Sequence, residues 1–320
     1  MSAIDKSQPI LIYLAGGVQG GAVVRAALRR GFKVRALVRD RKRVPALSAI
    51  GVELVEGDLR DPASLRAAGA GIAHAVMQIP IGSQDDMRIQ AENAVSASIA
   101  CGLKSVVLKL ASASRPAPCE EPSFVANAMI EDIVRRSGLP FCIVRPTMYL
   151  DNLLKPSALK DIVDEGVFAP PIAESQHIAW TSVDDCARAA MSLLAHGIHS
   201  GDYRIAGPDS VTGKELVSRM SLWLGRQITY RAQPLDEFER DVDAAMGPGT
   251  GCRVASKFRF FASNPDEADA ILSRPFEAGS ELKDFRPTGI EEWVRQHRRA
   301  FFESSASSAG DHGAIPRKTA

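Results

Sequence analysis

Short apolar runs alternate with segments of helical periodicity through the first half of the chain. Ile10–Leu14 is almost continuously apolar, as expected for a strand covered on both faces of a parallel sheet. Ala22–Arg30 has apolar residues at helical spacing and stops at Gly31, a common residue just after a helix. The same alternation predicts further strands at Lys33–Val38, Val52–Glu56, Ala73–Ile79, Ser105–Leu110 and Phe141–Arg145, and helices at Val44–Ile50, Asp85–Cys101 and Ser123–Ser137. Repeated β-α units of this length predict an α/β fold, a Rossmann-like doubly wound parallel sheet.

After Pro146 the pattern is less regular and prolines are more frequent. Helices are predicted at Asp184–His196, Gly213–Leu224 and Ile290–Phe302, and a strand at Asp202–Ile205. We therefore expect an NAD(P)-binding domain over residues 1–150, and a sheet extension with a small C-terminal substrate lobe over residues 151–302. The polar, small-residue segment 303–320 has the composition of a disordered tail.

Composition narrows the function classes. The 320 residues carry 39 Lys+Arg against 38 Asp+Glu, so the charge balance does not favour nucleic acid or an anionic membrane as a partner. No apolar run approaches the roughly 18 residues that span a bilayer, and the first residues lack signal-peptide features. The five cysteines are scattered, which favours reduced packing residues over disulfides or a metal site. We expect a cytoplasmic protein without a metal, with a homodimer or a regulatory protein partner left open.

A glycine-rich turn follows the first predicted strand, in "LIYLAGGVQGG". In dinucleotide-binding folds the pyrophosphate lies at a helix N-terminus, where free N–H groups and the helix dipole favour an anion. Gly16, Gly17 and Gly20 would allow the backbone to approach the phosphates. Glycine turns also occur for packing reasons alone, but the position between strand and helix favours a nucleotide site.

The end of the second predicted strand indicates which coenzyme would bind. Arg39 stands about 20 residues beyond the glycines, where an arginine suits a 2′-phosphate and an acidic residue suits a ribose hydroxyl. The alternative is a solvated, charged loop. We favour NADP(H) over NAD(H), with Asp58 and Pro80, which follow the third and fourth strands, as further cofactor-binding candidates; Asp58 could equally be a simple turn residue.

Together these segments resemble the NmrA-like branch of the atypical short-chain dehydrogenases/reductases. The resemblance extends from about Ile10 to Trp293 and rests on "VRALVRD", "GVELVEGDLRDPASL", "SGLPFCIVRPTMYLDNL", "AWTSVDDCARAA" and "DYRIAGPDSVTGKEL". It implies a Rossmann-like NAD(P) domain with a small lobe that encloses a pocket. Some members of this family reduce quinones, imines or phenolic compounds, and others are NADP-sensing regulators without turnover.

The chain departs from the pattern of the resemblance at three positions. In the family's G-x-x-G-x-x-G turn, the second and third glycines match Gly17 and Gly20, whereas the first falls on Leu14. The tight first turn is therefore in question, with Gly16 as an alternative bend. The superfamily's catalytic Tyr and Lys, four residues apart, fall on Ser123 and Asn127. A reductase built this way must work without that proton relay.

Two other residues are catalytic candidates. Tyr149 follows a strand at the sheet edge where open α/β sheets bind ligands, and could be a proton donor or a pocket wall. Lys109 lies in an apolar strand and could face a polar cleft or the sheet surface. A substrate pocket is expected from Met148, Tyr149, Phe168, His177 and Trp180.

Three functions remain open at this stage. The first is an NADP(H)-dependent reductase of a small aromatic, quinone-like or carbonyl compound, in which orientation by the protein matters most. The second is a catalytically silent NADP-sensing regulator, favoured by the missing Tyr and Lys. The third is a redox-free lyase or isomerase, favoured by Leu14 in the glycine turn.

Overall fold

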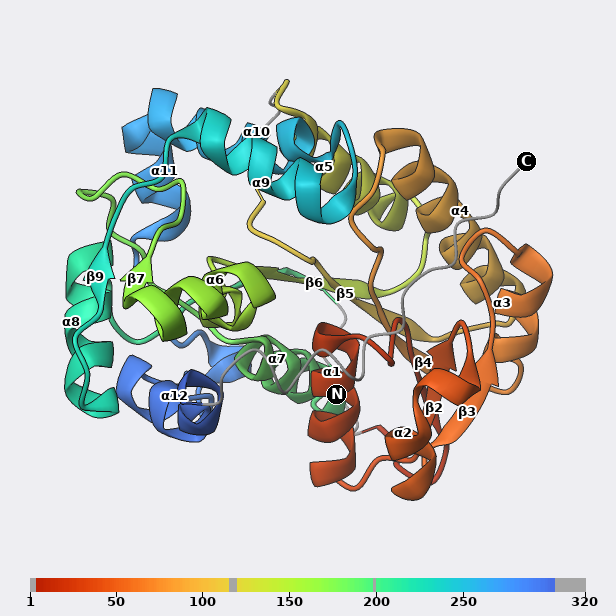
Figure 1. The fold of residues 1–320 in the computed structure, drawn as a ribbon. Coiled ribbons are helices and arrows are strands. Elements are labelled where there is room, and N and C mark those ends of the chain that lie inside the picture. Colours follow the sequence, from red (N-terminus) through yellow and green to blue (C-terminus); the bar gives the residue numbers. More distant parts are fainter. Residues whose placement is uncertain (1–3, 115–119, 198–199, 303–320) are drawn as a thin grey trace.

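A seven-stranded parallel sheet forms the centre of the molecule (Figure 1). The computed structural model describes residues 4–114, 120–197 and 200–302. The strands are β1 (Ile10–Ile12), β2 (Val34–Val38), β3 (Glu53–Glu56), β4 (His74–Met77), β5 (Ser105–Lys109), β6 (Phe141–Pro146) and β8 (Asp202–Ile205). Their order is β3-β2-β1-β4-β5-β6-β8, and every neighbouring pair is parallel. The predicted Rossmann-like sheet is confirmed, and its order reverses between β1 and β4, where such sheets bind ligands.

Two layers of helices cover the sheet. α1 (Val18–Arg29) packs beside α7 (Val183–Ala195) on one face, and α3 (Pro62–Gly69), α4 (Gln84–Ala100) and α5 (Pro122–Arg135) line the other. Side chains alternate between these faces along each strand. Ile10 and Ile12 join the cluster with α1 and α7, whereas Leu11 and Tyr13 join the cluster with α4. The continuous apolar runs in the sequence follow from this double coverage.

The C-terminal lobe has its own core. It contains a two-stranded parallel sheet, β7 (Val167–Phe168) with β9 (Thr229–Tyr230), and a set of helices around it. These helices are α6 (Pro156–Lys160), α8 (Gly213–Leu224), α9 (Leu235–Met246), α10 (Thr250–Ser263), α11 (Pro265–Leu272) and α12 (Ile290–Gln296). The remaining short elements of the chain are α2 (Pro45–Ala49), the 3-10 helices Arg41–Arg43, Leu150–Leu154, Ser280–Leu282 and Arg298–Phe301, and a π-helix at Asp161–Glu165. Phe260 and Phe261 of α10 contact Phe124 of α5 edge to face, which joins the lobe to the sheet domain.

The structure corrects several predicted boundaries. α1 begins at Val18 rather than Ala22, so Gly20 and Gly21 lie inside its first turn. α3 was not predicted, although Asp61 caps it by accepting from the Ala63 N–H and Pro62 occupies its first position. The predicted C-terminal helix ends at Gln296 and continues as a 3-10 turn. The predicted tail, 303–320, lies outside the described residues.

Within the described ranges, no helix combines the length and apolar character that crossing a bilayer requires.

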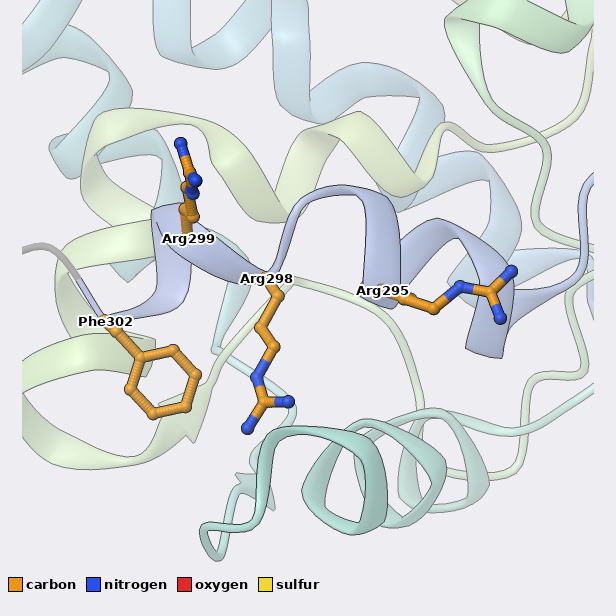
Figure 2. Close-up of a pocket in the computed structure, with 4 residues that line it drawn as sticks. All are labelled: Arg295, Arg298, Arg299 and Phe302. Carbon is orange, nitrogen blue, oxygen red and sulfur yellow. The ribbon is translucent and has the colours of Figure 1, made fainter.

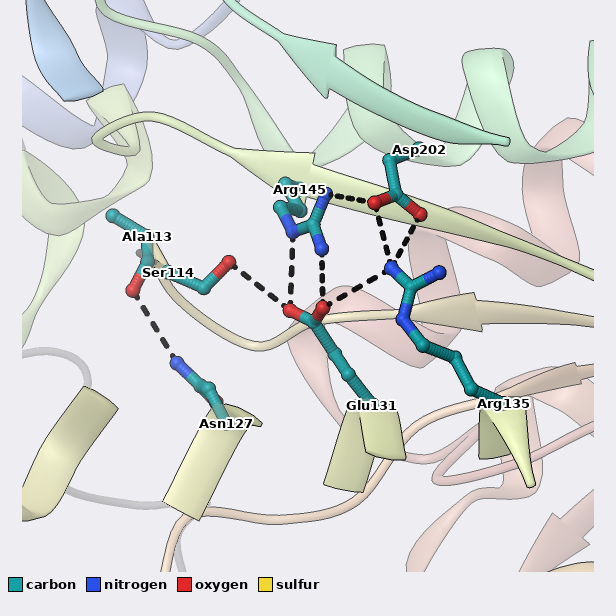
Figure 3. Close-up of polar contacts among 7 residues, drawn as sticks. All are labelled: Ala113, Ser114, Asn127, Glu131, Arg135, Arg145 and Asp202. Atoms are coloured by element: carbon teal, nitrogen blue, oxygen red, sulfur yellow. Dashed lines mark hydrogen bonds and ion pairs between the residues drawn. The ribbon is translucent and has the colours of Figure 1, made fainter. Parts of the chain in front are cut away.

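An ion network joins α5, β6 and β8 beneath the sheet edge (Figure 3). The Arg145 guanidinium donates to both carboxylate oxygens of Glu131, through Nε at 3.0 Å and through Nη2, and pairs with Asp202 at 2.8 Å. Arg135 also contacts Asp202, at 2.6 Å. Glu131 further accepts from the Ser114 hydroxyl at 3.3 Å, which ties the loop after β5 to the same network. The buried carboxylate of Glu131 therefore holds three segments together.

We expect Glu131→Ala to destabilise the protein strongly. It would leave the largely buried Arg145 with Asp202 as its remaining partner, and breaking a buried pair costs about 3 kcal/mol or more. The adjacent Asp132, which pairs with Arg136 in solvent, provides the control, because losing an exposed pair costs at most about 1 kcal/mol. Urea unfolding of both variants measures the difference. Equal costs would contradict the structural role of the network.

Candidate functional site

The glycine turn keeps the conformation that its sequence calls into question. Leu14 has φ 52°, the only positive φ at a non-glycine position among the described residues. Its carbonyl accepts from the Gly17 N–H at 3.0 Å. Leu14 itself thus takes the left-handed conformation that a glycine would supply, at a cost of about 1–2 kcal/mol. Gly16 is not needed as the alternative bend, and the partly buried Leu14 packs on the apolar cluster beside α4.

Beyond this bend the chain is open to a ligand. Gly16 and Gly17 are exposed, and Gly17 is the N-cap of α1. No side chain of the described residues caps the N–H groups of the first turn, and that turn contains no acidic residue. Gly20 allows the close packing, since a Cβ there would lie 2.0 Å from the Leu14 carbonyl oxygen. Free amides beside bare glycine backbone form an arrangement that fits a pyrophosphate.

Arg39 is the residue that the sequence predicts to contact a 2′-phosphate. It is the first residue after β2, and its side chain is exposed. Among the residues that the structure describes, nothing forms a hydrogen bond or ion pair with its guanidinium. Asp40, the adjacent carboxylate, instead caps the next turn through the Lys42 N–H and pairs with Arg43 at 3.6 Å. Arg39 is therefore available to an anionic ligand.

The positions of Asp58 and Pro80 are less specific to coenzyme binding than that of Arg39. The exposed Asp58 accepts from the Arg60 N–H at 2.8 Å, which is the contact of a turn residue. Pro80 is partly buried in the segment after β4. Two residues earlier, Gln78 is buried, and its Nε2 has no acceptor within the described part of the chain. This orphaned donor, at the carboxyl edge of the sheet, would suit an oxygen of a bound coenzyme.

Lys109 and Tyr149 meet at this edge. Lys109, the last residue of β5, has no exposed surface. Its ammonium donates to Tyr149 Oη at 3.0 Å, to Gln78 Oε1 at 3.4 Å and to Gln19 Oε1. Burial lowers the pKa of Lys109 to about 8, and burial raises the pKa of Tyr149 well above its usual value. At neutral pH the pair is therefore an ammonium beside a protonated phenol.

The superfamily's catalytic positions have structural uses here. Asn127, where the lysine would stand, donates to the Ala113 carbonyl at 3.3 Å (Figure 3). Its amide nitrogen also lies 3.5 Å from Ser112 Oγ. Ser123, where the tyrosine would stand, accepts at its hydroxyl from Ser256 of α10 at 3.0 Å. These contacts fasten the loop after β5 and the lobe to α5. Neither side chain can replace a phenol or an ammonium in proton transfer.

The expected pocket residues divide into two groups. Met148, Tyr149, Phe168 and Trp180 are buried, and the rings of Phe168 and Trp180 lie 6.4 Å apart in the lobe core. His177 is exposed and does not join them. The indole N–H of Trp180 is buried and has no acceptor among the described residues. Met148, in the lobe core, and Tyr149, which contacts Lys109, are neighbours in the segment after β6 and so connect this core to Lys109.

A separate surface pocket of about 490 Å³ lies at the C-terminal end of the lobe and is lined by Arg295, Arg298, Arg299 and Phe302. Figure 2 shows that the three guanidinium groups point in different directions. Because they do not converge on one point, this pocket lacks the geometry of a built anion site.

Comparison with known proteins identifies the family. The NmrA-like family profile matches residues 6–294. The chain belongs to the NmrA-like family. It is 26% identical over 296 residues to the NAD(P)H azoreductase of Xenophilus azovorans, which covers 91% of this chain and 99% of the relative. It is 25% identical over 228 residues to quinone oxidoreductase 2 of Escherichia coli (strain K12), covering 69% and 77% of the two chains. The crystal structure of Citrobacter sp. triphenylmethane reductase complexed with NADP(H) superposes with a TM-score of 0.72 at 21% identity, covering 90% of this chain and 99% of that one.

Within this NmrA-like site, the sequence did not reveal Gln19 or Gln78. Both are ordinary polar residues in the sequence, and no spacing rule links either of them to Lys109. The available signal was Lys109 itself, since a lysine in a buried strand requires acceptors from neighbouring segments. Gln78 follows β4, which is the neighbour of β5 in the sheet, and Gln19 lies in the first turn of α1. Only the strand order shows that both residues lie near Lys109.

Two adjacent glycines of this NmrA-like turn should respond oppositely to alanine. In Gly20→Ala the new Cβ would overlap the Leu14 carbonyl, so we expect a loss of at least about 3 kcal/mol of stability. In Gly21→Ala the Cβ would lie 3.6 Å from its nearest neighbours, and a helical alanine should add about 0.5–1 kcal/mol. Thermal unfolding of both variants distinguishes them, and a tolerated Gly20→Ala would show that α1 does not pack as described.

Proposed function

We propose that this protein is an NADPH-dependent reductase of a small aromatic, quinone-like or carbonyl compound. The observation that carries the proposal is the contact of Lys109 with Tyr149, at 3.0 Å, which Gln19 links to the glycine turn. A phosphate-binding turn and a pair of proton-transfer groups thus share one edge of the sheet. The reductases among the relatives support the same substrate class.

The residues fit the coenzyme in three places. The exposed Gly16 and Gly17 and the uncapped first turn of α1 would receive the pyrophosphate. Arg39 would hold the 2′-phosphate, which a guanidinium can bind through two parallel hydrogen bonds. The free amide N–H of Gln78 would donate to an oxygen of the ligand. When bound, the coenzyme supplies a hydride.

In this proposal Tyr149 supplies the proton. Its raised pKa keeps the phenol protonated at neutral pH, ready to donate to an oxygen or nitrogen of the substrate. The Lys109 ammonium, which donates to Tyr149 Oη, would stabilise the phenolate that forms. Lys109 would act from β5 and Tyr149 from beyond β6, in place of the Ser123 and Asn127 positions on α5. Met148, Phe168 and Trp180 would form the apolar side of the substrate site.

The proposal is tested by binding and turnover together. Calorimetric titration with NADPH and NADP⁺ should show binding, and addition of a naphthoquinone should consume NADPH. Tyr149→Phe should retain coenzyme affinity and lower kcat by about 10²-fold, because it removes the proton but keeps the ring. Binding without turnover of any quinone, azo or carbonyl compound would favour the NADP-sensing regulator instead. No binding at all would favour the redox-free lyase or isomerase.

Arg39→Ala should discriminate between the two coenzymes. Loss of a charged hydrogen-bonding pair costs about 1.5–3 kcal/mol, or about 10- to 100-fold in affinity for NADPH, while NADH should be almost unaffected. Arg43→Ala provides the matched control, since Arg43 pairs with Asp40 and should change neither affinity by much. Equal losses for NADPH and NADH in Arg39→Ala would remove the reason for choosing NADP(H).

A further inference from the structure

Gln19 lies between the two halves of the candidate site. It belongs to the first turn of α1, two residues after the N-cap Gly17, and it is partly buried. Its Oε1 accepts from the Lys109 ammonium and, at 3.4 Å, from the Tyr149 hydroxyl. Its Nε2 donates to the Ala111 carbonyl at 2.9 Å. One amide thus connects the glycine turn, the end of β5 and Tyr149 in the segment after β6.

The surroundings allow this amide only one orientation. The Lys109 ammonium has donors and no acceptor, and the Ala111 carbonyl has only an acceptor. Reversing the Gln19 amide would place N–H against N–H at one end and oxygen against oxygen at the other. The charge of Lys109 therefore fixes how Gln19 is held. Because Gln19 sits in the first helical turn and its amide is bonded at both ends, a shift of that turn would displace the oxygen that Lys109 uses.

We propose that Gln19 is a positioning residue that couples ligand occupancy of the glycine turn to the placement of Lys109 and, through it, of Tyr149. The inference rests on the proposed NADP(H)-dependent function, since it takes the occupant of the turn to be the coenzyme's phosphates. Gln19 does not contact the reacting atoms; it acts through Lys109. Coenzyme affinity should consequently depend on Lys109, and that dependence should require Gln19.

A double-mutant cycle on NADP⁺ affinity tests the coupling. At neutral pH, Lys109→Met should weaken binding about fivefold in the wild-type background and less than about twofold in the Gln19→Met background, because the connection is already absent. Direct attraction between the ammonium and the phosphates would instead give the same loss in both backgrounds. That additive result would overturn the proposal. Gln176→Met, a lobe glutamine whose amide donates to Asp269, serves as the control and should leave affinity unchanged.

The apo protein provides a second readout that needs no coenzyme. The groups around Lys109 are Gln19 of α1, Gln78 after β4, Tyr149 after β6, Cys186 of α7 and Asp151 of the 3-10 turn Leu150–Leu154. Burial lowers the pKa of Lys109 from 10.5 to about 8, with Cys186 and Asp151 opposing that shift. Between these two values the unfolded chain holds more protons than the folded one. Lys109 therefore makes stability rise with pH over this window.

Two near-isosteric substitutions should move this window in opposite directions. Gln19→Glu places a carboxylate on the ammonium and should raise the pKa of Lys109, so the rise in stability begins at higher pH. Gln19→Met removes an acceptor and should begin the rise at lower pH. Thermal unfolding across the window measures both, each relative to the same variant carrying Lys109→Met, which subtracts the titrating groups that do not interact with Lys109.

The outcomes distinguish failure of the Gln19 inference from failure of the proposed NADP(H)-dependent function. Shifts in the same direction, or none, would show that Gln19 does not hold Lys109 and would overturn the inference whatever the protein binds. Opposite shifts together with a non-additive cycle support it. If wild-type protein binds no NADP⁺, the proposed function falls and the coupling to a coenzyme falls with it, while the apo profiles still decide the contact between Gln19 and Lys109.

Discussion

A buried ammonium without an ion-pair partner determines how this site is built. Lys109 has no exposed surface, and none of the described carboxylates lies within ion-pair distance of its Nζ. A buried charge is tolerated only where polar atoms replace the water that it loses. Here the oxygens of Gln19, Gln78 and Tyr149 do so, each from a different segment. The Lys109 ammonium at the end of β5 therefore requires hydrogen-bond acceptors from α1, from the segment after β4 and from the segment after β6.

The same constraint places an ionisable pair, Lys109 and Tyr149, at the carboxyl edge of the sheet in an NmrA-like chain that lacks the superfamily's Tyr and Lys. On α5, Ser123 and Asn127 have become anchors for the lobe and for the loop after β5. The Glu131 network below them adds rigidity, because one carboxylate holds Arg145 and Ser114 at once. By strand alternation Lys109 points to the opposite face of the sheet, toward α1 and α7. On α5 the Ser123 and Asn127 side chains thus make structural contacts, and the Lys109–Tyr149 pair lies across the sheet from them.

In the glycine turn, Leu14 adopts the left-handed backbone conformation that a glycine usually provides. Leu14 accepts a left-handed φ, and its side chain finds apolar neighbours beside α4 that offset part of the strain. Gly20 has no such freedom, since its Cα faces the Leu14 carbonyl at a distance where no Cβ fits. Of the three glycine positions in the motif, the first therefore requires only a left-handed backbone, which Leu14 adopts. The third requires a residue without a Cβ, which only glycine provides.

The sequence by itself determined the fold class, the main strands and helices of the sheet domain, and the candidate phosphate-reading Arg39. Alternation and helical periodicity report which face of an element is buried, and this information is local. It placed the beginning of α1 four residues late, because the first turn holds two glycines, the polar Gln19 and the exposed Val18, and so carries no apolar periodicity. Tyr149 and Lys109 could be named as separate candidates but not as partners. Only the tertiary structure decided that they touch, and that Gln19 and Gln78 complete the group, because contacts across 31 to 130 residues depend on strand order and packing, which no local pattern encodes.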